Sequence, residues 1–178
     1  MVGHILADYH NYLFISVTEL LREECRKRGL SVARENLRNI SAEWRREQGL
    51  GVLVDRATEA FHESGGTQTY SGVVMASLRN PYEADRVHEL GGTMVWVDAE
   101  PTVRYQRVVG GGRGRGTEDQ RTYEQFLADE AAEMHPPEGA DQAVLNMAAV
   151  RDRVDITIPN NTNSPETFRH DIEKALGL

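Results

Sequence analysis

Residues 72–81 read GVVMASLRNP, and this stretch decides the fold class. Residues 72–77 form an uninterrupted run of apolar and small side chains, which is typical of a strand buried on both faces of a parallel sheet. A short turn follows, and Pro81 suits the first position of a helix because its ring fixes the backbone angle there. A buried strand, a turn and a helix in immediate succession predict an α/β fold.

The same alternation continues on both sides of this stretch. Further buried strands are predicted at 12–16 (YLFIS), 93–97 (TMVWV) and 154–158 (VDITI). Helices are predicted at 5–9, 16–29, 34–48, 52–63, 81–90, 101–109, 122–134, 145–151 and from 165 onward. Ser16 and Glu19 have the spacing of a capping box, so Ser16 is expected to cap its helix. The pattern predicts one domain, a parallel β-sheet with helices on both faces, which binds ligands at the carboxyl ends of its strands.

Composition limits the classes of function. The 178 residues suffice for one domain with a core, and the net charge of −8 argues against binding to duplex nucleic acid. Cys25 is the single cysteine, and no apolar run reaches the roughly 18 residues that span a bilayer. Both features favour a cytoplasmic protein without a membrane partner. The six histidines lack the spacing of metal ligands, so no metal-binding side chains are predicted.

Polar residues follow three of the predicted strands. Arg79 suits a phosphate or carboxylate ligand, and a surface salt bridge explains it equally well. Asp98 is expected chiefly to cap the helix that begins at Pro101. Asn160 and Asn161 offer amide groups to the edge of a base, although a plain turn accounts for them too.

A glycine–arginine segment follows the helix at 101–109. Arg104 and Arg107 are one turn apart in that helix, and GGGRGRG at 110–116 then contributes Arg113 and Arg115. A mobile flap with arginines would exclude water and neutralise charge during phosphoryl transfer. A flexible basic loop without a ligand is the simpler alternative, and an RNA-binding segment is disfavoured by the acidic chain.

In this order, the segments from Ile5 to Leu178 resemble the P-loop nucleotide kinases, in particular the dephospho-CoA-kinase-like and nucleoside-monophosphate-kinase-like proteins. The resemblance is carried by FISVTELLREECRKRGL (14–30), ENLRNISAEWRREQG (35–49), GVVMASLRNPYEADRVHELGG (72–92), VWVDAEPTVRYQRV (95–108), TYEQFLADEAAEM (122–134) and DITIPNNTNSPETF (155–168). It implies an acceptor-binding helical region at about 17–66 and a lid at about 108–135.

The resemblance further implies transfer of the γ-phosphoryl group of ATP, with Mg²⁺, to a nucleotide or a dephospho-CoA-like acceptor. The residues that it assigns are Arg107, Arg113 and Arg115 for catalysis, Arg79 and Ser16 for substrate binding, and Gly3, Asn160 and Asn161 for the nucleotide cofactor. The partner is then a small-molecule nucleotide, and an exposed sheet edge would favour a homodimer.

The sequence departs from these kinases at the phosphate-binding loop. The pattern G-x-x-x-x-G-K-[ST] is absent, and neither Lys27 nor Lys174 lies at a strand-to-helix turn. Ala76 and Gly111 stand where relatives often carry an acid and an arginine. Two functions therefore follow from the resemblance: a phosphotransferase, or a kinase-like module that binds a nucleotide or a protein without turnover.

The first strand of these kinases is also missing. It lies in the middle of the sheet, between the strands that match 72–77 and 93–97, so its absence predicts two interior edges with unpaired backbone groups. Three explanations follow: a true start upstream of Met1, direct pairing of the two neighbouring strands, or a strand from another chain. We favour the first, because the rest of the pattern is intact.

Overall fold

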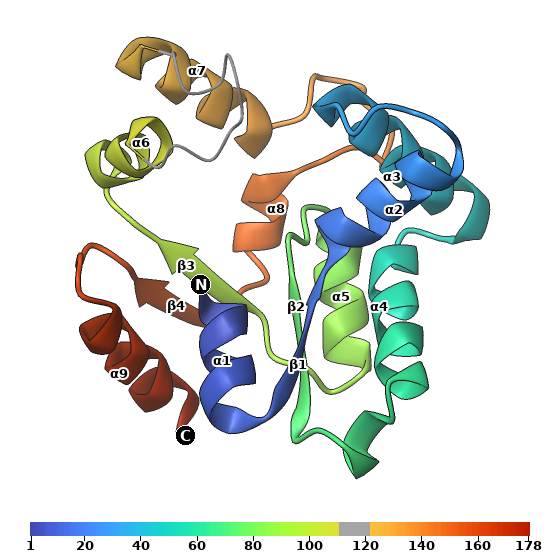
Figure 1. Ribbon diagram of the computed structural model, residues 1–178. Helices are drawn as coiled ribbons and strands as arrows, with labels where there is room; N and C mark the ends of the chain where they lie inside the picture. Colours follow the sequence, from blue (N-terminus) through green and yellow to red (C-terminus); the bar gives the residue numbers. More distant parts are fainter. Residues whose placement is uncertain (111–121) are drawn as a thin grey trace.

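The computed structural model describes residues 1–110 and 122–178 and has an α/β architecture in which short strands alternate with helices (Figure 1). Its strands are β1 (Tyr12–Ser16), β2 (Gly72–Ala76), β3 (Val95–Asp98) and β4 (Ile156–Pro159). Its helices are α1 (Val2–His10), α2 (Val17–Lys27), α3 (Arg34–Gln48), α4 (Val52–Glu63), the 3₁₀ helix η1 (Gly66–Gln68), α5 (Pro81–Glu89), α6 (Pro101–Val109), α7 (Tyr123–Met134), α8 (Met147–Arg151) and α9 (Pro165–Leu176). The predicted order of elements is therefore confirmed.

Within the described residues, the strands form two parallel pairs and not one continuous sheet. β1 pairs with β2, with Tyr12 opposite Gly72, and β3 pairs with β4, with Val95 opposite Ile156. The prediction of a single sheet is thus wrong in this respect. The split falls between β2 and β3, where the sequence predicted two interior edges. Direct pairing of these two neighbours, one of the three explanations, does not occur here.

Helices α1 and α9 cover one face of both strand pairs. Val74 of β2 and Val95 of β3 pack against a single apolar cluster, although their strands are not paired. The cluster is built on Ile5, Leu6, Ile158, Phe168 and Ile172. Because α1 contributes to this shared core, it holds the two strand pairs together.

Helices α4, α5 and α8 cover the opposite face. Side chains of Val73 and Met75 in β2 point to α4, one residue away from Val74, as the alternation of a strand requires. On the second pair, Trp96 packs against a cluster of Ala84 from α5 and Val150 from α8. Both pairs therefore have helices on both faces, which agrees with the predicted layering.

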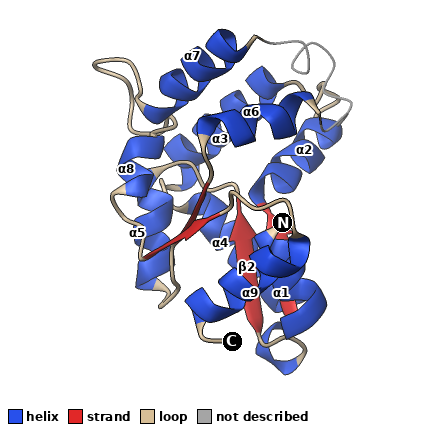
Figure 2. Cartoon of the chain, turned by 90° about the vertical axis from the view of Figure 1, so that its left-hand side faces the viewer, coloured by secondary structure: helices blue, strands red, loops and turns tan. Residues whose placement is uncertain are grey.

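The carboxyl ends of the strands point to a group of helices at one end of the molecule. β1 runs directly into α2 and β3 into α6, and Figures 1 and 2 show α2, α3, α6 and α7 together at this end. Cys25 is fully buried in a core between α2 and α3, with Ile40 and Trp44 as neighbours. None of the described helices is long and apolar enough to cross a membrane.

The start of α2 corrects one prediction. Ser16 precedes the helix, but its hydroxyl accepts no capping hydrogen bond. The Glu19 carboxylate instead accepts bonds from Arg22 (3.0 Å) and Arg26 (3.1 Å), which lower its pKa. Two arginines on the same helix face outcompete the backbone for this carboxylate, so the expected capping box does not form.

Candidate functional site

The turn that carries Arg79 is fixed by a buried carboxylate. Glu83 of α5 is fully buried, and its Oε2 accepts hydrogen bonds from the backbone N–H groups of Arg79 (2.8 Å) and Asn80 (3.1 Å). The Asn80 side chain accepts a bond from the Tyr82 N–H, which completes a capping box at the start of α5. The backbone of Arg79 is therefore held in place at the carboxyl end of β2.

The second oxygen of Glu83 binds Arg45 of α3. The Arg45 Nε and Nη2 atoms lie 2.9 and 2.6 Å from Glu83 Oε1, and the two side chains are 2% and 0% exposed. Arg45 Nη1 also donates to the Ala143 carbonyl (2.9 Å), while the Asn80 amide donates to the carbonyls of Gln142 and Val144. This network joins α3, the turn after β2 and the segment that precedes α8.

Three arginines meet one carboxylate beside this network. Glu133, at the end of α7, forms ion pairs with Arg79 (3.3 Å), with Arg38 (3.5 Å) and with Arg34. Arg34 and Arg38 are one turn apart on α3 and so present their guanidinium groups on the same side. We call Arg34, Arg38, Arg79 and Glu133 the arginine–Glu133 cluster. The ion-pair interpretation of Arg79 is thus confirmed, and its phosphate-binding role stays a prediction.

A cavity of about 320 Å³ adjoins the cluster. One wall is α3, which contributes Arg38 and Arg46, and the other is the end of α7 with the segment after it, which contributes Glu133 and Pro136. The remaining lining residues are Asn39, Ser41, Ala42, Arg45, Ala132, Pro137, Ala143, Val144 and Leu145. Part of the arginine–Glu133 cluster therefore faces a space large enough for a small polar ligand.

Asp98, at the end of β3, does not cap α6. Residue Glu100 holds the capping position, and no side chain makes the capping bond. Asp98 accepts instead from the N–H of Ala99 (2.8 Å) and from Arg104 Nη1 (2.8 Å). Arg104 also forms a two-pronged pair with Glu130 of α7, at 2.8 and 2.7 Å, and this carboxylate raises the pKa of Arg104.

Arg107 is joined to the loop after β4. Its guanidinium donates to the carbonyls of Asn160 (2.7 Å) and Thr162 (2.6 Å), whereas Arg104 contacts α7. Asn161 lies in the same loop, and its side chain accepts a bond from the Glu100 N–H (2.7 Å). The structure thus brings the predicted residues Arg107, Asn160 and Asn161 together. Their hydrogen bonds connect α6 and the residue before it to the loop after β4.

The other predicted residues are distributed as follows. Ser16 ends β1, at the same end of the paired strands as the turn carrying Arg79. Gly3, predicted to bind the cofactor, is buried in α1, and a methyl group there would overlap the ring of Phe14. Close packing of α1 on β1 therefore accounts for Gly3. Arg113 and Arg115 lie outside the described residues.

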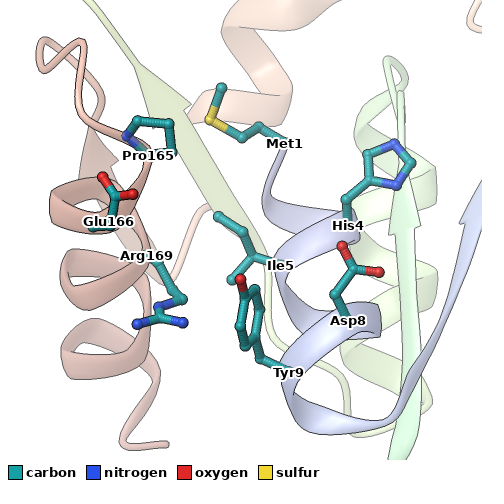
Figure 3. Close-up of a pocket in the computed structure, with 8 residues that line it drawn as sticks. All are labelled: Met1, His4, Ile5, Asp8, Tyr9, Pro165, Glu166 and Arg169. Atoms are coloured by element: carbon teal, nitrogen blue, oxygen red, sulfur yellow. The ribbon is translucent and has the colours of Figure 1, made fainter.

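A second cavity, of about 570 Å³, lies between α1 and α9 (Figure 3). Arg169 stacks on the ring of Tyr9, at 4.4 Å from its centroid, and both side chains point into the space between the helices. His4 turns to the other side of α1, where its ring contacts Phe14. The polar groups of this cavity do not converge on one point, so the arginine–Glu133 cluster is the stronger candidate site.

Sequence reasoning missed Arg34, Arg38 and Glu133, as well as the buried pair of Arg45 and Glu83. One signal was available. Asn80-Pro81-Tyr82-Glu83 has the spacing of a capping box with proline at the first helical position, which would have directed attention to Glu83. The partners of Glu133 come from distant segments and leave no comparable local pattern.

The chain is similar to UPF0200 proteins from archaea. That of Pyrobaculum aerophilum is 25% identical over 173 residues, covering 96% of this chain and 86% of the relative. That of Pyrococcus abyssi is 25% identical over 163 residues, covering 89% and 79%. That of Hyperthermus butylicus is 30% identical over 118 residues, covering 65% and 59%. No protein-family model matches the chain. The similarity to UPF0200 proteins thus extends over most of the sequence, and the names of these relatives state no activity.

Proposed function

We propose that this chain is a nucleotide kinase-like domain that binds the phosphate group of a nucleotide or of a dephospho-CoA-like acceptor through the arginine–Glu133 cluster. One observation carries the proposal: three guanidinium groups, from α3 and from the turn after β2, converge on a single carboxylate. Guanidinium groups bind carboxylate and phosphate oxygens with the same forked geometry. The arrangement that holds Glu133 is therefore suited to a phosphate.

The arginines are carried by a rigid support. The backbone of Arg79 is fixed by Glu83, and Arg45 connects Glu83 to α3, the helix that carries Arg34 and Arg38. The pair of Arg45 and Glu83 at the centre of this support is buried. Binding sites on such pre-organised elements lose little conformational freedom when a ligand arrives, which favours affinity.

The described residues fit the phosphate groups of ATP less well. The lysine of a phosphate-binding loop has no counterpart among them, since Lys27 ends α2 and Lys174 lies on α9. Gly3 is occupied by its contact with Phe14. Transfer of the γ-phosphoryl group is the reaction that the family resemblance adds to the proposal, with Arg107 as a candidate for charge neutralisation.

The alternative is a kinase-like binding module without turnover, and the missing lysine favours it. The two functions share the arginine–Glu133 cluster and differ in whether ATP is consumed. Assaying ADP release with ATP, Mg²⁺ and either a nucleoside monophosphate or dephospho-CoA separates them. Turnover supports the phosphotransferase, and saturable binding without turnover supports the binding module.

The binding proposal is tested by isothermal titration of the chain with AMP and with dephospho-CoA. Each is expected to bind saturably, and Arg79→Gln is expected to weaken binding about ten- to a hundredfold, the effect of losing one charge-assisted hydrogen bond. Arg26→Gln is the matched control, because Arg26 is an exposed arginine on α2 whose partner is Glu19. Equal affinity in the Arg79→Gln and Arg26→Gln variants would contradict the proposal, as would absence of saturable binding both to the wild-type chain and to a variant without the Glu133 carboxylate.

A further inference from the structure

Helix α7 presents two glutamates to arginines that follow two different strands. Glu130 pairs with Arg104, which follows β3, and Glu133 pairs with Arg79, which follows β2. Glu130 and Glu133 are three residues apart and so lie on the same face of the helix. This face of α7 is thus complementary in charge to Arg104 of α6 and to Arg79 of the turn after β2.

Glu133 sits in the cluster as a ligand would. Its Oε1 faces Arg34 and Arg38, and its Oε2 faces Arg79, so that one carboxylate bridges two structural elements. The side chain of Glu133 is 23% exposed, whereas those of the three arginines are 39–51% exposed. The carboxylate is therefore the inner member of the cluster, and the arginines keep part of their surface open to solvent.

We propose that Glu133 is an internal competitor for the phosphate-binding arginines, so that a phosphate-bearing ligand binds by displacing it. This inference rests on the proposed function, because both use the same three arginines. It adds a regulatory property: the affinity for the ligand is lowered by the fraction of molecules in which Glu133 occupies the site. The chemical class of ligand is a phosphate monoester or diphosphate, whose charge exceeds that of one carboxylate.

Displacement of Glu133 would also open the adjoining cavity. Ala132, Glu133, Pro136 and Pro137 form its wall on the α7 side, and α3 forms the opposite wall. Glu130 lies one turn earlier and keeps its pair with Arg104, which does not belong to the cluster. The end of α7 therefore moves away from α3 while its middle stays attached to α6.

The decisive variant is Glu133→Gln, which has nearly the same shape and lacks the charge. Titration with inorganic pyrophosphate and with AMP is expected to show binding about tenfold tighter than in the wild-type protein, since the competitor that is removed is a single carboxylate paired with partly exposed arginines. Glu124→Gln is the matched control on the same helix, because Glu124 is exposed and has no ion pair within the described part of the chain. This variant is expected to bind with wild-type affinity. Adding Arg79→Gln to Glu133→Gln is expected to abolish the gain.

A second variant and a second measurement cover a folding defect in Glu133→Gln. Glu133→Asp keeps the charge and withdraws it by one methylene, and it is expected to tighten binding by less than the glutamine variant. In the wild-type protein, pyrophosphate is expected to accelerate amide hydrogen exchange in residues 132–135, because the ion pairs between Glu133 and α3 are lost.

The outcomes separate the two proposals. If the wild-type protein binds and Glu133→Gln binds no more tightly, or amide exchange at residues 132–135 is unchanged, the competitor is overturned and the proposed function stands. Absence of binding to the wild-type protein and to both Glu133 variants overturns the two proposals together. Binding that appears only in Glu133→Gln supports the competitor directly.

Discussion

Replacing Arg45 with methionine should destabilise the protein strongly, because it removes the cation from a buried ion pair. The two side chains are 2% and 0% exposed, so water cannot solvate the Glu83 carboxylate that remains. Removal of one partner from a buried pair costs about 3–5 kcal/mol. Glu83 keeps the hydrogen bonds that it accepts from two backbone N–H groups. Because these bonds still stabilise the carboxylate, we expect a cost at the lower end of this range. The carbonyl of Ala143 loses its donor, which adds about 1 kcal/mol. We therefore expect a loss of about 4 kcal/mol.

Urea unfolding followed by circular dichroism measures this loss, provided that the slope of the unfolding free energy against urea concentration is the same in both proteins. For a domain of this size, about 4 kcal/mol corresponds to a fall in Tm of roughly 8–16 °C. Arg46→Met is the matched control. Arg46 is the next residue, its pair with Asp141 is about half exposed, and its loss should cost no more than about 1 kcal/mol.

A double-mutant cycle with Glu83→Gln isolates the pair itself. The losses in Arg45→Met and Glu83→Gln should not add, and the coupling free energy between the two sites should exceed about 2 kcal/mol. A loss below about 1 kcal/mol in Arg45→Met, or a coupling free energy near zero, would refute the view that this pair holds α3 against the turn after β2.

Two further predictions concern packing and pH. Gly3→Ala should reduce the free energy of unfolding by about 1–3 kcal/mol, because the added methyl group overlaps the ring of Phe14. Equal urea midpoints for the wild-type protein and Gly3→Ala would speak against tight packing of α1 on β1. The Met94 N–H and the His88 ring hold the pKa of Asp155 below its usual value. This carboxylate therefore stabilises the folded state above the ordinary aspartate pKa, and the contribution is lost as the pH falls through the lowered value. Asp155→Asn should flatten the decline of the urea midpoint below about pH 4; a decline as steep as that of the wild-type protein would contradict this assignment.

The elements could be predicted because their signals are local. The run of apolar residues at 72–77, the proline at 81 and the asparagine before it suffice for a strand, a turn and a helix. Two unpaired edges at β2 and β3 were also expected, since the family resemblance implied a strand between them, but the separation into two strand pairs was not. These predictions depend on contacts between residues near in sequence, or on a known order of strands.

The side-chain network of the candidate site could not be predicted in the same way. Arg38 and Glu133 are 95 residues apart, and no periodic pattern connects them. Nearby arginines also explain why two predicted helix caps are wrong. Glu19 binds arginines of its own helix, and Asp98 binds Arg104 and does not cap α6. In both cases the carboxylate forms a charge-assisted bond to a guanidinium group and does not cap the helix.

The two strand pairs are held together by links of different physical kinds. The apolar link is α1, whose cluster receives Val74 from one pair and Val95 from the other. The polar link is α7, where Glu133 contacts the turn after β2 and Glu130 contacts the helix after β3. Salt screens half-exposed ion pairs and leaves apolar burial intact. A change in ion concentration, or an anion that displaces Glu133, therefore acts on the carboxyl ends of the strands and spares the core beneath them, which is the arrangement expected of a site that opens without unfolding.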